Sequence, residues 1–134
     1  MIRKVVYFSM QVPNRPGIGV EMLKSIAKGR QNLLAFTGFP NKGGAQVDFV
    51  PQDNAKFMQA ARKAKMKVSS RKTVFLAQGE DRVGALVRVL DTLAKAKINM
   101  VAMDAVTAGS GRFGAIFWVR PKDVGRASRL LGAR

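Results

Sequence analysis

The chain has 134 residues, 47% of them hydrophobic, and carries 24 Lys and Arg against 8 Asp and Glu, a formal net charge of +16. This apolar content excludes an intrinsically disordered chain, and the length fits one domain or two very small ones. The sequence has neither cysteine nor histidine, which excludes disulfides, thiolate metal sites and every catalytic pair built on Cys or His. We therefore expect a protein that is not an enzyme and that has no cofactor and no metal site.

The first half of the chain predicts a strand, a helix, two further strands and a second helix. Residues 5–12 form a β-rich run, and the first helix follows with Ile18, Met22 and Ile26 on one face. Apolar β-rich segments at 33–39 and 45–50 are separated by Pro40-Asn41-Lys42-Gly43-Gly44, a sequence typical of a hairpin turn.

The second helix is expected to begin at Asp53, a plausible N-cap, and to bury Phe57, Ala61 and Ala64. A fourth strand is expected around residues 66–70, running almost directly into the next strand.

The second half repeats the first at an offset of 67 residues. Residues that coincide include Phe8 with Phe75, Gln11 with Gln78, Arg15 with Arg82, Gly17 with Gly84, Leu23 with Leu90 and Asn32 with Asn99. So many matches in register indicate a duplication.

The second half therefore predicts the same elements again. A strand at 73–78 precedes a helix that places Leu86, Leu90 and Leu93 on one face, and strands at 100–106 and 113–119 flank a Gly-rich turn. A last helix starts near Asp123, with Val124, Ala127 and Leu131 as its apolar face. Because only a few residues follow it, the final strand of this copy is expected to be missing or reduced to a stub.

A distinctive loop joins strand to helix at the start of each copy. The loops read Pro13-Asn14-Arg15-Pro16-Gly17-Ile18-Gly19 and Glu80-Asp81-Arg82-Val83-Gly84-Ala85. Pro16 fixes φ, and Gly17 allows a ligand to approach the backbone closely. Free N–H groups at the helix start, with the helix dipole behind them, favour an anion such as a carboxylate.

These loops, the helices after them and the segment Ala96-Lys97-Ile98-Asn99-Met100-Val101 resemble the ACT family of amino-acid-sensing regulatory domains. The resemblance covers essentially the whole chain, twice. It implies an α+β fold of two ferredoxin-like βαββαβ modules in tandem, residues 1–70 and 71–134, with antiparallel sheets and helices on one face. The second module would lack most of its last strand.

The resemblance also implies a ligand held between this loop and a neighbouring module, with a polar contact from Asn32 or Asn99. The candidate ligand-binding residues are Asn14, Arg15, Pro16, Gly17, Ile18, Gly19, Asn32, Leu33, Asp81, Arg82, Val83, Gly84, Ala85, Leu86, Asn99 and Met100. The first loop keeps the Pro-Gly pair but has Asn14 in place of Asp, whereas the second has Asp81 but Val83 in place of Pro. The intact pair favours the first loop.

In function, the resemblance implies a stand-alone, non-catalytic allosteric sensor of a small molecule, most simply an amino acid. Without an attached catalytic domain, such a sensor would regulate an enzyme or the transcription machinery in trans. An incomplete second sheet leaves an exposed edge, which favours a homodimer. No secretory signal and no run of about 18 apolar residues is present, so we expect a cytoplasmic protein that does not enter the membrane.

The alternative is an RNA-binding or other nucleic-acid-binding module of RNA-recognition topology. Val74-Phe75-Leu76 and Arg112-Phe113-Gly114-Ala115-Ile116-Phe117 resemble the aromatic strands of that fold, and the positive charge suits a polyanion. However, Ala115 replaces the central aromatic residue, and the turn at Asp81 suits the ACT pattern better. The densest basic stretch, residues 62–72, fits either a nucleic-acid surface or ordinary solvated helix faces.

Overall fold

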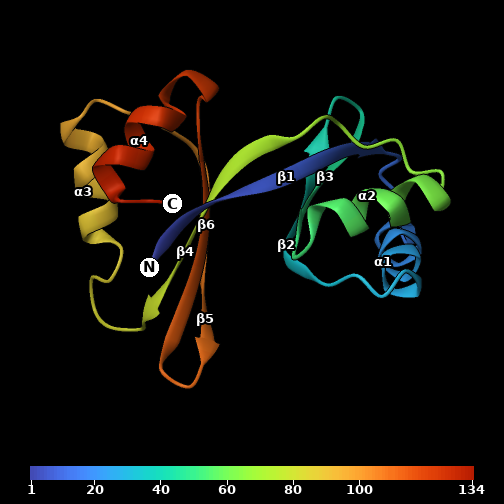
Figure 1. Ribbon diagram of the computed structural model, residues 1–134, viewed down its shortest axis with the longest axis horizontal. Helices are drawn as coiled ribbons and strands as arrows, with labels where there is room; N and C mark the ends of the chain where they lie inside the picture. The colour runs from blue at the N-terminus through green and yellow to red at the C-terminus, as the bar shows by residue number, and fades with distance from the viewer. The chain divides into compact units, whose positions relative to one another are not determined.

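The structure is a computed structural model that describes residues 1–134. It is an α+β protein with six antiparallel strands and four α-helices (Figure 1). In chain order the elements are β1 (Ile2–Val12), α1 (Ile18–Lys28), β2 (Leu33–Asn41), β3 (Gly44–Pro51), α2 (Asn54–Lys63), β4 (Lys72–Glu80), α3 (Val87–Lys95), β5 (Met100–Gly109), β6 (Arg112–Val119), a 3-10 turn (Pro121–Asp123) and α4 (Val124–Leu131). None of the helices is both long and apolar enough to cross a bilayer.

The order βαββα occurs twice, and the chain divides into two compact units. The N-terminal unit comprises Val6–Lys72, and the C-terminal unit comprises Thr73–Arg134 together with Met1–Val5. The first five residues, assigned to the first module on the basis of sequence, therefore have their contacts in the second.

The N-terminal unit has the strand order β2-β3-β1, with α1 and α2 packed against each other. Alternation along the strands places Phe8, Phe49 and Phe36 in one row, because Phe8 and Phe36 both pair with Phe49. The ring of Phe57 from α2 lies 5.3 Å from those of Phe8 and Phe49. The predicted apolar face of α1 is confirmed, since Met22 and Ile26 are buried and Ile18 packs against the same cluster.

Both β-hairpins have two-residue turns whose central residues take positive φ. These are Lys42 (φ 52°) and Gly43 (φ 79°) in the first, and Ser110 (φ 53°) and Gly111 (φ 68°) in the second. Positive φ at both positions matches the twist of the flanking strands. The predicted turns are confirmed, but a lysine and a serine hold the positions for which Asn and Gly were expected.

In the C-terminal unit, α3 and α4 cover one face of β4, β6 and β5 (Figure 1). Phe75 and Phe117, which are register partners, stack with their ring centroids 5.1 Å apart in its core. Two predicted core residues are wrong. Ala64 is exposed at the C-cap of α2, and Leu90 is 42% exposed on α3, where Val89 is buried with Leu93 instead. Because Val89 and Leu93 are four residues apart on α3, they share the buried face, and Leu90 is rotated away from it.

The fourth strands differ from the sequence prediction. Residues 66–70 form no regular strand; this segment follows β1 through the Ser69 N–H, which donates to the Ser9 carbonyl at 2.8 Å, and the Ser9 N–H, which donates to Ser69 Oγ at 3.0 Å. No strand follows α4, as expected.

The position beside β4 is nevertheless occupied. The Met1 amino group donates to the Gln78 carbonyl at 2.6 Å, and the Gln78 N–H donates to the Met1 carbonyl at 2.9 Å. This exchange of two bonds is the antiparallel pattern. The start of β1 thus fills the place of the missing strand, so the edge that was expected to be free at β4 is covered. Within their own units, β2 and β5 are edge strands.

Candidate functional site

The first predicted loop is exposed from Pro13 to Gly17. Gly17 adopts φ 90° at the N-cap of α1, where an alanine Cβ would meet no atom within 4 Å. The Ile18 N–H donates to the Arg15 carbonyl at 3.4 Å. The Arg15 guanidinium lies 3.3 Å from a Glu21 carboxylate oxygen, in an ion pair whose side chains are 53% and 62% exposed. The glycine therefore shapes the turn as predicted, and the loop lies in solvent.

The second loop lies beside a pocket of about 350 Å³ in the C-terminal unit. Five predicted site residues line it, namely Asp81, Arg82, Gly84, Ala85 and Leu86, together with Val87, Leu90, Ala105, Val106, Thr107 and Phe113. Val83 is fully exposed and does not line the pocket. The volume falls within the range of small-molecule sites.

Backbone hydrogen bonds define the shape of this second loop. The Asp81 N–H donates to the Gly111 carbonyl at 2.8 Å, which ties the loop to the β5–β6 hairpin. Gly84 has φ 74°, and the Ala85 and Val87 N–H groups donate to the Arg82 and Gly84 carbonyls at 3.1 and 3.0 Å. The Ala85 N–H therefore already has a backbone acceptor. The Leu86 N–H has no backbone acceptor and remains a potential donor.

The pocket combines both charges with an apolar wall. Asp81 and Arg82 are adjacent and exposed, and neither forms an ion pair. Leu90 and Val106, 42% and 69% exposed, supply apolar surface from α3 and β5. A carboxylate, a guanidinium and an apolar wall are the groups that would complement the ammonium, carboxylate and side chain of an amino acid.

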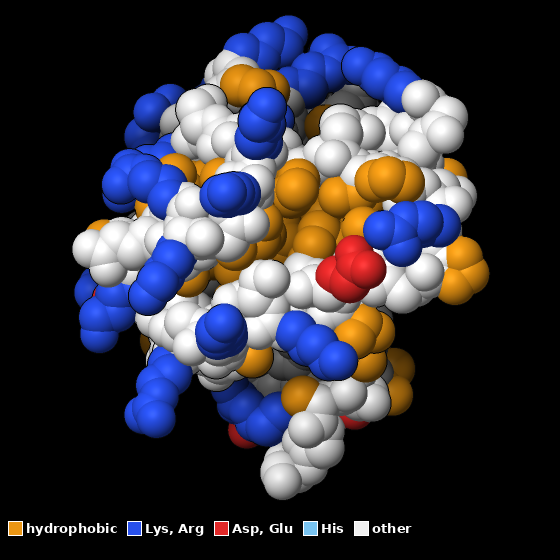
Figure 2. All heavy atoms as spheres, turned by 90° about the vertical axis from the view of Figure 1, so that its right-hand side faces the viewer, with side chains coloured by type: hydrophobic (Ala, Val, Ile, Leu, Met, Phe, Trp, Pro, Cys, Tyr) orange, Lys and Arg blue, Asp and Glu red, His pale blue; other side chains and the backbone are white.

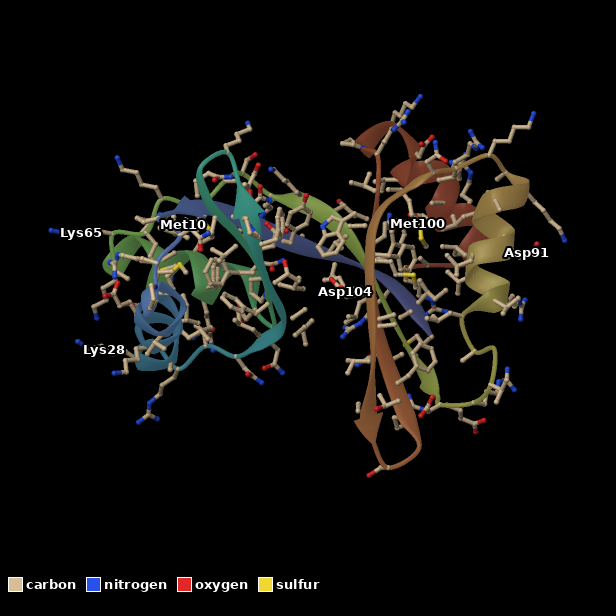
Figure 3. All side chains as sticks on the ribbon, turned by 180° about the vertical axis from the view of Figure 1, so that it is seen from behind. Met10, Lys28, Lys65, Asp91, Met100 and Asp104 are labelled. Carbon is tan, nitrogen blue, oxygen red and sulfur yellow. The ribbon has the colours of Figure 1, made fainter.

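The remaining predicted residues lie at the other end of each unit. Strand register pairs Met100 with Val119 and Thr107 with Phe113, so Asn99 and Met100 are at the end of β5 away from the loop. Figure 3 shows Met100 there, with its side chain directed toward the helices. Leu33 pairs with Pro51, which places Asn32 and Leu33 in the same way in the N-terminal unit. The structure therefore does not bring these four residues to the loops.

Sequence reasoning missed the β5 wall of the pocket, formed by Ala105, Val106 and Thr107. The register of the β5–β6 hairpin could have predicted that these residues lie beside the second loop. A tight turn at Ser110-Gly111 places Thr107 opposite Phe113 and Glu80 opposite Arg112, at the sheet end where β4 leads into the loop.

The basic residues lie on exposed surface. Figure 2 shows Lys and Arg side chains spread over one face of the N-terminal unit, around an apolar area and with few acidic groups. All six basic residues of the 62–72 stretch are exposed, and Lys65 extends into solvent (Figure 3). Two aromatic residues of the RNA-binding alternative are not available: Phe75 and Phe117 are both 0% exposed in the core, so neither can stack on a base, whereas Phe113 is half-buried.

One carboxylate has a clearly shifted pKa. Asp48 is 3% exposed in the middle of β3, and burial raises the pKa of its carboxyl above the ordinary value. A hydrogen bond from Gln46 Nε2 at 2.9 Å and the charge of Lys72 act in the opposite direction. Asp48 is remote in sequence from both loops and lines neither of them.

The sequence matches no family model and no curated protein. Solved structures resemble it over nearly its whole length. Protein BT0572 from Bacteroides thetaiotaomicron has a TM-score of 0.76 at 20% identity and covers 98% of this chain and 88% of its own. The ligand-free regulatory subunit of aspartate kinase from Thermus thermophilus has a TM-score of 0.63 at 13% identity, with 98% and 93% covered. The aspartokinase alpha and beta subunits give 0.59 at 17% identity, with the same coverage.

Proposed function

Because the chain has the fold of ACT-domain regulatory proteins, as its loops predicted, we propose that it is a non-catalytic regulatory protein that binds an amino acid. The pocket beside the second loop is the proposed site. The observation that carries this proposal is the convergence of Asp81, Arg82 and the Leu86 N–H on one partly apolar pocket. The aspartate kinase neighbours support regulation by a domain of this fold.

In this proposal each group has one role. The Leu86 N–H, at the start of α3, and the Arg82 guanidinium bind the α-carboxylate of the ligand. Asp81 binds the α-ammonium group, for which the first loop has only the uncharged Asn14. Leu90 and Val106 contact the side chain of the ligand. The structure thus favours the second loop, although the intact Pro16-Gly17 pair favoured the first.

One wall of the pocket is β5, an edge strand whose residues Val101 and Val106 are 64% and 69% exposed. Such an edge offers unpaired backbone groups and apolar surface to a second strand. We propose that two copies pair along β5 in a homodimer that encloses the ligand. The signal would be read in the cytoplasm by an enzyme or by transcription machinery acting in trans.

Gly84 and Gly17 provide a matched pair of variants for testing the site. Both have positive φ, so an alanine at either position carries a similar backbone strain of about 1–2 kcal/mol. We expect thermal-shift screening against the twenty amino acids to find a stabilising ligand whose effect is lost in Gly84→Ala and retained in Gly17→Ala. The reverse pattern would move the site to the first loop. A ligand retained by the folded double variant would place it outside both loops.

A further inference from the structure

The C-terminal unit has a second, larger cavity besides the loop pocket. It measures about 660 Å³ and is bounded by α3, by the end of α4 and by the start of β1. No residue that lines it also lines the loop pocket. A ligand in this cavity would therefore contact other residues than a ligand in the proposed amino-acid site.

The charged side chains of this cavity are all basic. Arg3, Arg88 and Arg134 line it, and no Asp or Glu does. The two ion pairs of the protein, Arg15 with Glu21 and Lys95 with Asp91, lie elsewhere. None of the three guanidinium groups forms an ion pair, either with an acidic side chain or with the α-carboxylate of Arg134. Guanidinium groups bind phosphate through paired hydrogen bonds, so this lining favours a phosphate-bearing anion.

The rest of the lining is apolar. Ile2, Val89 and Leu131 belong to or pack against the core of the unit, and Leu130 is 49% exposed at the wall. The Thr92 hydroxyl, one turn after Arg88, donates to the Arg88 carbonyl at 2.8 Å and keeps its lone pairs available to accept. The cavity is much larger than a phosphate ion requires, so it has room for an apolar or aromatic part of the ligand and for a donor group.

We propose that this cavity is a second binding site, which takes a nucleoside phosphate. Arg88, with Arg3 and Arg134, binds the phosphate groups, the base and sugar contact Val89 and Leu130, and Thr92 accepts a hydrogen bond from an amino or hydroxyl group. A single cavity of about 660 Å³ suits a free nucleotide, whereas a nucleic-acid backbone needs a basic groove that continues along the surface. The protein would then respond to an amino acid and to a nucleotide at separate sites.

The test uses the full chain and isothermal titration calorimetry at one fixed salt concentration. The probes are ATP, AMP, adenosine and inorganic phosphate. We expect ATP and AMP to bind and adenosine to bind at least tenfold more weakly. Arg88→Ala should weaken ATP binding at least tenfold, whereas Arg120→Ala should not, because Arg120 is an exposed arginine that lines neither this cavity nor the loop pocket. Gly84→Ala should retain ATP binding, which separates this site from the amino-acid site.

A second variant covers the case in which Arg88→Ala unfolds the unit. Leu130→Asp places a negative charge on an exposed wall residue and should abolish ATP binding in a protein with unchanged circular dichroism. No binding of ATP or AMP at millimolar concentration would overturn the proposal. So would equal losses in Arg88→Ala and Arg120→Ala, or a single-stranded oligonucleotide that competes with ATP in both variants, since these results indicate diffuse attraction by the basic surface.

Discussion

Ile2 and Val6 lie four residues apart on strand β1, yet they pack against different hydrophobic cores. Ile2 contacts the cluster built around Phe75 and Leu93, and Val6 contacts the cluster built around Phe8. We therefore expect Ile2→Ala to destabilise the C-terminal unit and Val6→Ala to destabilise the N-terminal unit. The two substitutions are a matched pair, because both shorten a half-buried β-branched side chain in the same strand.

The magnitudes follow from the carbon groups removed. Ile→Ala removes three and Val→Ala removes two, each contributing about 0.8 kcal/mol when fully buried. At half burial the losses are about 1.2 kcal/mol for Ile2→Ala and about 0.8 kcal/mol for Val6→Ala. Since 1.4 kcal/mol is a tenfold change, the affected unit should open roughly eightfold and fourfold more often.

Native-state hydrogen exchange measures both units in one experiment. Amides of β6 report on the C-terminal unit, and amides of β3 report on the N-terminal unit. Ile2→Ala should accelerate exchange in β6 and leave β3 unchanged, and Val6→Ala should do the opposite. Faster exchange in β3 for Ile2→Ala, or the same change in both strands for both variants, would refute the division of β1 at Val5.

Two further predictions concern the N-terminal unit. Because burial raises the pKa of Asp48, the folded protein binds this proton more tightly than the unfolded chain, so this carboxyl lowers stability as the pH rises from about 3.8 through the raised pKa. Urea unfolding of Asp48→Asn should show a flatter pH profile there and higher stability at pH 7; lower stability at pH 7 would contradict this. A Cβ at Gly29 would stand 2.8 Å from the Ala60 Cβ, so Gly29→Ala should cost about 1–3 kcal/mol by overpacking α1 against α2. Gly19→Ala, with no atom within 4 Å, is the control, and an equal loss there would argue against the close helix contact.

The local elements of this fold could be predicted from sequence because their signals are local. Asp53 caps α2 as expected, with its carboxylate accepting from the Lys56 N–H at 3.0 Å. Asp123 was predicted by the same rule but makes no such bond, because Pro121–Asp123 forms a 3-10 turn before α4. A preceding proline that starts a turn early changes the backbone at the cap position.

The same local signals could not predict strand pairing between segments that are far apart in sequence. Nothing in Met1–Val5 indicates that these residues pair with β4, because any β-rich segment of suitable length satisfies a strand edge. The loop side of the proposed site could be predicted from sequence, but its β5 side could not, because that side depends on strand register. The turn chemistry identified Gly84 and Asp81, whereas Val106 lies beside them only through the register of β5 on β6.

The placement of Met1–Val5 has a consequence for how the chain folds as it is synthesised. These residues find their partners only after β4 has been made, more than seventy residues later in the chain. Contacts so distant in sequence are slow to form, because the intervening loop must be closed first. The N-terminal unit has all its own strands and can fold early, while the start of β1 remains unpaired until the C-terminal unit follows. Domains generally fold in order of synthesis, so the shared strand makes completion of the second unit the last step.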